Sequence, residues 1–363
     1  MKKWIAGTAA ALLAAVLFTS TRVEAISAKK AIVLDAQTGR VLYAQGENDR
    51  ALIASTTKIM TALIVCEQCN VLDRMKIPKE AVGIEGSSMY LQEGEVLTIQ
   101  ELLYGLMLRS GNDAAVALAI YCGGTVEGFA QLMNDKAHRL GMENTHFVNP
   151  NGLDAPGHYS TARDMAVLAS YAMENPIFRQ TVSTKSVTIG NRILQNHNKL
   201  LWRVEGADGV KTGYTKAAGR ILVSSTTRDG RRIIVVTMDD PNDWQDHEKL
   251  IEDAFSKFTV KTLITKADIL GTVEVAGGEA GEVELLAGKS FSFTLRQDEK
   301  VDVCLPAPGF VYAPVVEGAQ AGYAHILIDG VSVGTVPLVY GQTVERTEEK
   351  KLTLIERICN LFH

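Results

Sequence analysis

The chain has 363 residues, of which 46% are hydrophobic and 22% charged, and its formal net charge is −5. This composition is that of a globular protein, and the length indicates two domains, or one large domain and one small. Because the charge is negative and no general basic field exists, we expect no nucleic acid among the partners.

Residues 1–25 have the pattern of a secretory signal. A lysine pair precedes an apolar run that ends near Phe18, and Val23 and Ala25 fit the small-residue rule at −3 and −1 of a signal-peptidase site. The apolar run is too short to span a membrane. The sequence therefore predicts an exported protein, and an uncleaved anchor is the alternative.

The cysteines are too few for a disulfide scaffold. Cys66 and Cys69 have the spacing of a redox or zinc motif, but no second pair and no nearby histidine accompany them. We expect ordinary thiols at all five positions, with oxidation of one pair as the alternative: Cys66, Cys69, Cys122, Cys304 and Cys359.

The first elements after the signal are a predicted β-hairpin and a buried helix. Two β-rich runs, 31–35 and 40–44, flank a turn that contains Gly39. Ser55 and Lys58 then stand at the start of an apolar run, 59–65, which predicts a buried helix. Residues 71–96 contain glycines and a proline, so loops and short strands are expected there.

A group of helices follows. Thr98 and Glu101 form a capping box at the start of an apolar-periodic helix, which breaks at 110–112. Further helices are predicted at 113–121, 126–140 and 161–174, the last ending before Pro176. A polar stretch rich in glycine and proline, 144–158, separates two of them.

Strands return after about Val182. Residues 208–213 lead into a predicted hairpin, 221–227 and 233–237, whose turn contains an Asp-Gly pair. A helix at about 244–258 closes this part. Because strands lie at both ends and helices between, the sequence predicts an α+β domain whose antiparallel sheet is assembled from both termini, with a helical cluster packed on it.

The remainder of the chain has a different pattern. From about 260 to 345, short β-rich runs alternate with glycine-rich turns, which predicts a small all-β domain. Residues 350–363 have apolar residues at helical spacing and a cationic cluster of Lys350, Lys351 and Arg357. The segment is too short to span a membrane, and its pattern is that of an interfacial helix. A terminal helix packed on the β domain is the alternative.

Three short motifs carry the candidate chemistry: Ser55-x-x-Lys58, Ser110-Gly-Asn112 and Lys211-Thr-Gly213. Residues three apart share a helix face, so the Lys58 nitrogen can reach the Ser55 hydroxyl. A lysine desolvated at that depth has a lowered pKa and can act as a base. Taken alone, the first motif also fits a helix cap followed by a solvated lysine.

Acyl transfer explains the residue types in these motifs. We expect Ser55 to be the nucleophile, Lys58 the base and Ser110 a proton relay to the leaving amine. Asn112 is expected to hold Lys58 and a substrate amide, while Lys211 and Thr212 bind a free carboxylate. Gly213 would let the substrate approach the strand edge. The oxyanion hole is expected from the backbone N–H groups of Ser55 and of Tyr214 or Thr215. A helix cap at Ser110 and a surface charge at Lys211 are the structural alternatives.

The three motifs, in this order behind a signal peptide, match those of penicillin-recognising acyl-serine enzymes. The chain resembles the low-molecular-mass penicillin-binding proteins of the D-alanyl-D-alanine carboxypeptidase type over roughly residues 28–345. The resemblance extends to residues 107–114, 144–147, 152–157, 159–165 and 208–215. It implies a β-lactamase-like serine acyl-transferase domain that removes the terminal D-alanine from peptidoglycan pentapeptide stems. It also implies covalent inhibition by β-lactams and no metal or cofactor.

Two departures from the family pattern bear on turnover. Some relatives have histidine directly after the third motif, where Tyr214 stands here. Asp239 and Asp240 occupy the place where a basic partner for the substrate carboxylate is expected. A penicillin-acylated sensor without turnover therefore stays open, as does a class A β-lactamase, although the E-x-x-L-N loop of that class is absent between the second and third motifs.

The predicted organisation has four parts. Residues 1–25 are the signal, 26–258 the carboxypeptidase domain, 259–345 the all-β domain and 346–363 a membrane-associating helix. This places the protein at the outer face of the cytoplasmic membrane, attached peripherally. We also expect the loop 152–159, including Asp154, to border the active site and to influence deacylation.

Overall fold

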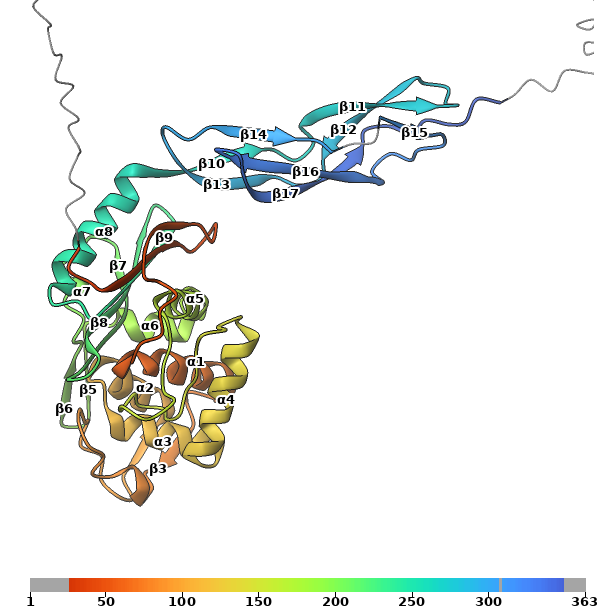
Figure 1. The fold of residues 1–363 in the computed structure, drawn as a ribbon. Coiled ribbons are helices and arrows are strands. Elements are labelled where there is room, and N and C mark those ends of the chain that lie inside the picture. Colours follow the sequence, from red (N-terminus) through yellow and green to blue (C-terminus); the bar gives the residue numbers. More distant parts are fainter. Residues whose placement is uncertain (1–25, 307–308, 349–363) are drawn as a thin grey trace, which may run out of the picture.

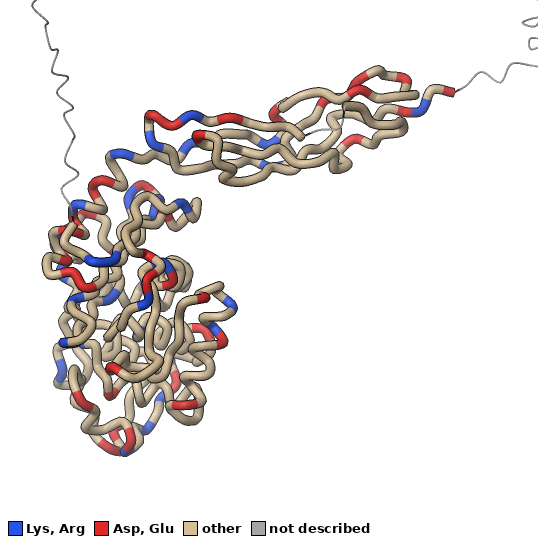
Figure 2. Tube along the Cα trace, in the orientation of Figure 1, with Lys and Arg blue, Asp and Glu red and all other residues tan. Residues whose placement is uncertain are grey.

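The computed structural model describes residues 26–306 and 309–348. They form a catalytic domain and an elongated all-β domain, joined where helix α8 (Asp243–Lys257) runs directly into strand β10 (Phe258–Ile264) (Figure 1). The predicted fold class, α+β followed by a small all-β domain, is confirmed. Acidic and basic residues are interspersed along both domains (Figure 2), so neither carries a general basic field.

One antiparallel sheet organises the catalytic domain, with the strand order β2-β1-β9-β8-β7. Strand β1 pairs with β9, so the two ends of the domain meet in the middle of the sheet, as predicted. The edge position of β7 bears directly on the active site. The strands are β1 (Lys30–Asp35), β2 (Val41–Gln45), β7 (Ala207–Thr215), β8 (Gly219–Arg228) and β9 (Arg231–Met238).

Both faces of this sheet are covered, because side chains alternate between two apolar layers. Ala31 and Val33 pack against α8, in a cluster with Leu250 and Ile251. Their neighbours in β1 face the helical cluster on the opposite side. Burial on both faces accounts for the nearly continuous apolar sequence of β8 and β9.

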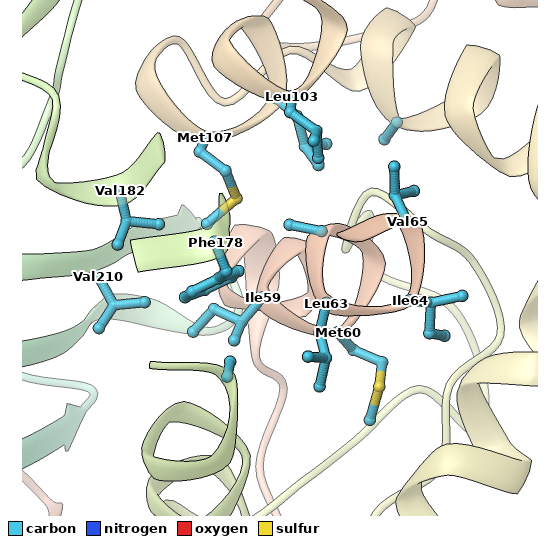
Figure 3. Packing of buried hydrophobic residues seen from close by; sticks show 14 of the residues in the cluster. Ile59, Met60, Leu63, Ile64, Val65, Leu103, Met107, Phe178, Val182 and Val210 are labelled. Atoms are coloured by element: carbon cyan, nitrogen blue, oxygen red, sulfur yellow. The ribbon is translucent and has the colours of Figure 1, made fainter. Parts of the chain in front are cut away.

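Helix α1 (Lys58–Gln68) is the centre of the helical cluster, and every residue from Lys58 to Cys66 is buried. Figure 3 shows Ile59, Met60 and Leu63 of α1 among side chains from α2, α6 and β7. A helix enclosed on all sides needs apolar residues all round, which is what the sequence provides. The helices around it are α2 (Ile99–Leu108), α3 (Asn112–Gly123), α4 (Val126–Arg139), α5 (Ala162–Ala172) and α6 (Pro176–Ser183).

The structure contains elements that the sequence pattern did not predict. The helix expected at 161–174 does end before Pro176, but Pro176 also occupies the first turn of a further helix, α6, which the sequence pattern did not predict and which Asn175 caps. Proline is favoured at that position because the missing N–H has no helical partner there. Short strands lie in the stretch after residue 71 and again after Val182, as the sequence indicated: β3 (Arg74–Lys76), β4 (Val96–Thr98), β5 (Ser186–Ile189) and β6 (Arg192–Gln195). The short helices η2 (Lys79–Ala81) and α7 (Leu200–Arg203) were not predicted. The Thr98–Glu101 capping box is present as predicted.

The all-β domain has a six-stranded sheet, ordered β14-β16-β17-β12-β11-β15, and the pair β10-β13. Its core is a separate apolar cluster that includes Val273, Leu285 and Ile326. Backbone contacts continue to Thr347, whose N–H donates to the carbonyl of Gly277. The strands are β11 (Ile269–Ala276), β12 (Glu282–Ala287), β13 (Phe291–Arg296), β14 (Val301–Cys304), β15 (Phe310–Tyr312), β16 (Gln320–Ile328) and β17 (Val331–Tyr340).

A buried polar cluster joins the two domains. Asp35 at the end of β1 is fully buried, with the Arg231 guanidinium at 2.8 Å. The Thr294 hydroxyl of β13 donates to the same carboxylate at 2.8 Å. Arg40 donates to Glu299 at 2.7 Å across the junction. Since every charge in the cluster is paired, burial does not leave an isolated charge.

The expectation of ordinary thiols is wrong for two cysteines. Cys69 at the end of α1 and Cys122 in α3 form a disulfide, although they are 53 residues apart in sequence. Spacing could not reveal this pair, because the packing of α1 against α3 brings the two Cα atoms to 6.7 Å. Cys66 is a buried free thiol whose pKa burial raises to about 12, and Cys304 is exposed and free. Cys359 lies outside the described residues.

The signal at 1–25 and the proposed membrane-associating segment from residue 349 onwards also lie outside the described residues. Within the part of the chain that the structure describes, no single helix has both the length and the apolar composition needed to cross a membrane. The pair α3 and α4 meets both criteria only when taken together, across a bend of 81°.

Candidate active site

Ser55 lies in a tight 3-10 turn, η1 (Ala54–Thr57), immediately before α1. The turn begins at Ala54, whose φ of 43° is in the left-handed region that residues with a side chain seldom occupy. Gly152 packs against this residue so closely that a Cβ there would lie 1.9 Å from the Ala54 carbonyl oxygen. The strained turn is therefore held in place by a neighbouring loop, as is common at functional sites.

Lys58 begins α1 one turn after Ser55 and is completely buried. Its Nζ donates to Ser55 Oγ at 3.0 Å, to Asn112 Oδ1 at 2.7 Å and to the Asn151 carbonyl. Burial lowers the Lys58 pKa well below its usual value, the nearby Lys211 charge lowers it further, and Asp113 opposes both. The predicted contact between the serine hydroxyl and a desolvated lysine is present.

The second motif forms the turn between α2 and α3. Ser110 is buried with a φ of 60°, and its hydroxyl has no hydrogen-bond partner among the described residues. Asn112 begins α3 and uses its Nδ2 to donate to the Glu85 carbonyl. Asp113 accepts hydrogen bonds from the N–H groups of Met89 and Leu91. These contacts fix the segment 85–91 beside the motif.

The third motif lies within strand β7 and precedes the β8–β9 hairpin, as predicted. Because β7 is an edge strand, one side of its backbone is free to pair with a ligand. Lys211 is buried, and its Nζ donates to the Thr212 carbonyl at 2.8 Å. Burial lowers its pKa to about 7. A Cβ at Gly213 would lie 3.2 Å from Thr56 Cγ2, so the glycine allows β7 to pack against the Ser55 turn.

A cavity of about 350 Å³ brings the three motifs together. Five of the predicted residues line it: Ser55, Ser110, Thr212, Gly213 and Tyr214. Lys58, Asn112 and Lys211 are buried beneath it, and Thr215 contacts Asp154 through its hydroxyl at 3.1 Å. The other lining residues are Ser87, His197, Lys199, Arg220, Asp243 and Trp244.

Comparisons with known proteins identify the arrangement. Residues 18–242 match the family model for D-alanyl-D-alanine carboxypeptidase, and residues 258–346 match that for the C-terminal domain of penicillin-binding protein 5. The chain belongs to the D-alanyl-D-alanine carboxypeptidase family.

Individual relatives agree with the family assignment. D-alanyl-D-alanine carboxypeptidase DacC of Escherichia coli is 35% identical over 341 residues, covering 88% of this chain and 85% of the relative. DacF of Bacillus subtilis is 30% identical over 339 residues, covering 88% and 86%. The structure of penicillin-binding protein 5 from Haemophilus influenzae matches with a TM-score of 0.76 at 29% identity, covering 89% of this chain and 98% of that one.

The family resemblance seen in the motifs is thus confirmed, and the protein is a serine-type carboxypeptidase. A low-molecular-mass penicillin-binding protein combines this catalytic domain with this all-β domain. The sensor and β-lactamase alternatives are not favoured by relatives that carry the carboxypeptidase name along most of the chain.

The two departures from the family pattern have different positions in this carboxypeptidase. Tyr214 lines the cavity with 66% of its surface exposed. Asp239 and Asp240 do not line the cavity. Asp239 pairs with Lys29 at 2.6 Å, and Asp240 accepts a hydrogen bond from Ser27 Oγ at 2.6 Å. The two acids therefore bond to the N-terminal segment and do not face the substrate.

Sequence reasoning missed the cationic part of the cavity, which comes from Lys199 and Arg220. Lys199 and His197 follow β6 in a turn held by Asn196 and Asn198, each of which accepts an N–H two residues on. Arg220 lies directly opposite Tyr214 in the β7–β8 pair. The register of that hairpin was the one signal that could have placed Arg220 beside the third motif.

The loop 152–159 lies next to the site: Gly152 packs on Ala54, Asp154 accepts a hydrogen bond from the Thr215 hydroxyl, and the Asn151 carbonyl just before the loop accepts one from Lys58. An influence of the loop on deacylation stays a prediction. His158 in this loop is buried; its Nδ1 accepts the Val148 N–H at 3.0 Å, so its Nε2 carries the proton toward Thr57 Oγ1 at 2.8 Å. Burial lowers the His158 pKa to about 4. A neutral histidine therefore braces the turn that carries Ser55.

Proposed function

We propose that Ser55 is the residue acylated during D-Ala-D-Ala hydrolysis and that Lys58 is its base. The supporting observation is the 3.0 Å contact between Lys58 Nζ and Ser55 Oγ inside a cavity that the other two motifs share. In its neutral form Lys58 keeps two N–H donors, for Asn112 Oδ1 and the Asn151 carbonyl, and turns its lone pair to the Ser55 hydroxyl. It takes the hydroxyl proton as Ser55 Oγ attacks the carbonyl between the two D-alanines. The C–N bond then breaks, the terminal D-alanine leaves as an amine, and water later cleaves the ester.

The remaining roles follow from the same placement. Substrate pairs in extended form with the free edge of β7, so that its carbonyl oxygen meets the N–H groups of Ser55 and of Tyr214 or Thr215. Ser110, whose buried hydroxyl has no other partner among the described residues, passes a proton to the leaving amine. Asn112 orients Lys58 and uses its second Nδ2–H for the substrate amide. Lys211 and Thr212 contribute to binding the free carboxylate of the substrate.

The substrate is the D-Ala-D-Ala end of a peptidoglycan pentapeptide stem, and β-lactams acylate the same serine. The carboxypeptidase and penicillin-binding names of the relatives support this assignment. To test it, purified protein is incubated with a D-Ala-D-Ala tripeptide and, separately, with a fluorescent penicillin. We expect D-alanine release with turnover and a single adduct on Ser55. Labelling without release would identify a sensor, and an adduct on Ser110 would contradict the assignment of the nucleophile.

We further propose that the protein is exported and peripherally attached to the outer face of the cytoplasmic membrane. The sequence of residues 1–25 and the cationic, amphipathic pattern of 350–363 support this. The corresponding division of the chain is 26–258 for catalysis, 259–345 for the all-β domain and 346–363 for the anchor, whose first residues, Arg346 and Thr347, also pair with the all-β domain.

Flotation with anionic vesicles tests the attachment. The mature chain should float, whereas a chain ending at Glu348 should not, while keeping full activity on a small peptide. Ending at Glu348 retains the contact between Thr347 and Gly277, so the all-β domain is left intact. Equal flotation of both chains would contradict the anchor, and unfolding of the shorter chain would indicate a terminal helix that packs on protein.

A further inference from the structure

One side of the active-site cavity carries cations that the three motifs do not supply. Arg220 and Lys199 line this side together with Asp243 and Trp244. The Arg220 guanidinium and the Lys199 ammonium each lie 5.9 Å from the centre of the Trp244 ring. Both cations therefore lie near the same aromatic ring and line the same cavity as Ser55 and Thr212.

Arg220 is held in one orientation by a single partner. Its Nη2 lies 2.9 Å from both carboxylate oxygens of Asp243, the first residue of α8. Asp243 is buried, and its Oδ1 also accepts the Trp244 N–H at 3.0 Å, so the acid is fixed by the start of the helix. Among the described residues, no other hydrogen bond from the Arg220 guanidinium is seen. Nη1 and Nε therefore keep their donors for a ligand.

Arg220 lies where the terminal D-alanine, the part of the substrate that is released, is expected to bind. Arg220 is the cross-strand partner of Tyr214, and directly opposed residues share one face of a sheet. Tyr214 in turn lies two residues after Thr212 on the same strand. Its side chain is 43% exposed, so a ligand can reach it. Lys211, the cation of the third motif, is buried beneath the cavity and donates to a backbone carbonyl. A guanidinium stays charged at every physiological pH and binds carboxylates with two parallel hydrogen bonds.

We propose that Arg220, oriented by Asp243, binds the free α-carboxylate of the terminal D-alanine and so restricts the enzyme to peptides with a free carboxyl end. The inference rests on the acyl-transfer roles proposed above. It assigns to β8 the basic group that Asp239 and Asp240 do not provide after β9. Arg220 is thus a specificity-determining residue, and Asp243 is a positioning residue.

The test compares two substrates that differ only at this end: a D-Ala-D-Ala tripeptide and its C-terminal amide. Wild-type enzyme should prefer the free acid in kcat/KM. Arg220→Ala should lower kcat/KM for the acid by about 10- to 100-fold, the usual loss of a charge-assisted hydrogen-bond pair, and leave the amide within about threefold. Arg220→Lys should recover part of the preference, because it restores charge without the planar fork.

A matched control lies on the same strand. Arg228 also pairs with a carboxylate of α8, Glu252, but does not line the cavity. Arg228→Ala should leave the ratio of acid to amide unchanged. In Arg220→Ala the buried Asp243 loses its partner, so Arg220→Gln combined with Asp243→Asn provides a pair without charge. If the preference for the acid is also lost there, repulsion from an unpaired Asp243 is not the cause.

The outcomes separate this inference from the proposed function. If wild-type protein fails to release D-alanine from either peptide, the proposed function fails. If Arg220→Ala retains the wild-type preference, or loses acid and amide turnover equally while its melting temperature is normal, Arg220 does not bind the carboxylate. A penicillin and its methyl ester give a second comparison. In Arg220→Ala the rate of acylation should fall for the free acid and stay unchanged for the ester.

Discussion

The active-site cavity has two walls whose charged side chains differ in their exposure to solvent. We call them the buried wall, formed by Lys58, Asn112 and Lys211, and the open wall, formed by Lys199, Tyr214 and Arg220. The lysines of the buried wall have almost no exposed surface, and their Nζ atoms donate to Asn112 Oδ1 and to the Thr212 carbonyl. On the open wall, 66% of Tyr214 and 43% of the Arg220 side chain are exposed.

This difference assigns different tasks to the two walls. Burial makes the charged form of a lysine costly, so the buried wall controls which groups hold protons. An exposed arginine keeps its charge, and solvent screens its interactions, so the open wall serves recognition. Substitutions in the buried wall should therefore affect the acylation step itself, whereas those in the open wall should change substrate preference or KM.

The largest effect is expected from substitution of Ser55, the proposed nucleophile, which lies between the two walls. Ser55→Ala removes the attacking oxygen and should lower D-alanine release by at least about a thousandfold. Penicillin labelling, followed by mass spectrometry of the intact protein, should disappear as well. An unchanged melting temperature shows that the variant is folded. Residual labelling at Ser110 would mean that the second motif supplies the nucleophile.

Lys58→Arg should have the next largest effect. A guanidinium cannot be deprotonated in a protein, so the variant keeps a cation but loses the base, and acylation should slow by about 10²- to 10⁴-fold. The rate of fluorescent-penicillin labelling measures this directly. Lys136→Arg is the matched control, because Lys136 is also buried and pairs with Glu67 at 2.7 Å outside the site. Similar slowing in both variants would point to general damage from a larger buried side chain.

The pH dependence of acylation should report the buried wall. Lys58 must be neutral to act, so activity rises as pH increases through its lowered pKa. Lys211 has a pKa of about 7, so its positive charge is present below pH 7 and is lost above it. The expected kcat/KM profile for a free-acid peptide is a bell with a decline that begins near neutral pH. Lys211→Arg should remove that decline, and a decline that persists would have another source.

Much of the fold was predictable because its elements have local signals. The apolar run after Lys58 indicated α1, and the Asp-Gly pair at 229–230 indicated the β8–β9 hairpin. Helix α6 was missed, because a proline that ends one helix and a proline that begins the next look the same in sequence. The disulfide depends on the packing of α1 against α3, which no spacing between Cys69 and Cys122 encodes.

The two walls of the site were not equally predictable. The buried wall comes from three motifs whose residue types follow from acyl-transfer chemistry. The open wall depends on tertiary placement: Arg220 reaches Asp243 only because β8 and the start of α8 lie side by side.

Tyr214→Ala should have a much smaller effect than any change in the buried wall. Its side chain is largely exposed, and substrate pairing uses the backbone of β7. Because Tyr214→Ala keeps the backbone N–H groups that pair with substrate, kcat should stay within about threefold, a change of under about 1 kcal/mol in the barrier, with a modest rise in KM. Steady-state kinetics on a D-Ala-D-Ala tripeptide measure both. A fall in kcat comparable to that of Lys58→Arg would mean that the tyrosine hydroxyl takes part in proton transfer.

The smallest expected effect lies outside the cavity, at Asp240. Burial raises the pKa of its carboxyl to about 6, and the nearby Asp246 contributes. A raised pKa means that the folded state holds the proton more tightly than the unfolded state. This stabilising contribution is complete below the ordinary pKa of 3.8 and is lost as pH rises through about 6. Above pH 6 the folded protein therefore carries a buried charge at a cost.

Asp240→Asn should remove that cost while keeping the amide oxygen in place for Ser27 and for the Asn242 N–H. Its new Nδ2 would have acceptors in the Thr237 hydroxyl and the Asp246 carboxylate, both within hydrogen-bonding reach of the Asp240 carboxyl. Because Asp246 shares the shift, the gain at pH 7.5 should be about 1 kcal/mol, or about 2–4 °C in Tm, and should vanish at pH 4. Thermal unfolding across this range measures the difference. Asp239→Asn is the control, since Asp239 is partly exposed and paired with Lys29, and it should show no such growth of stability with pH. Catalysis should be unchanged in both variants, because neither acid lines the cavity.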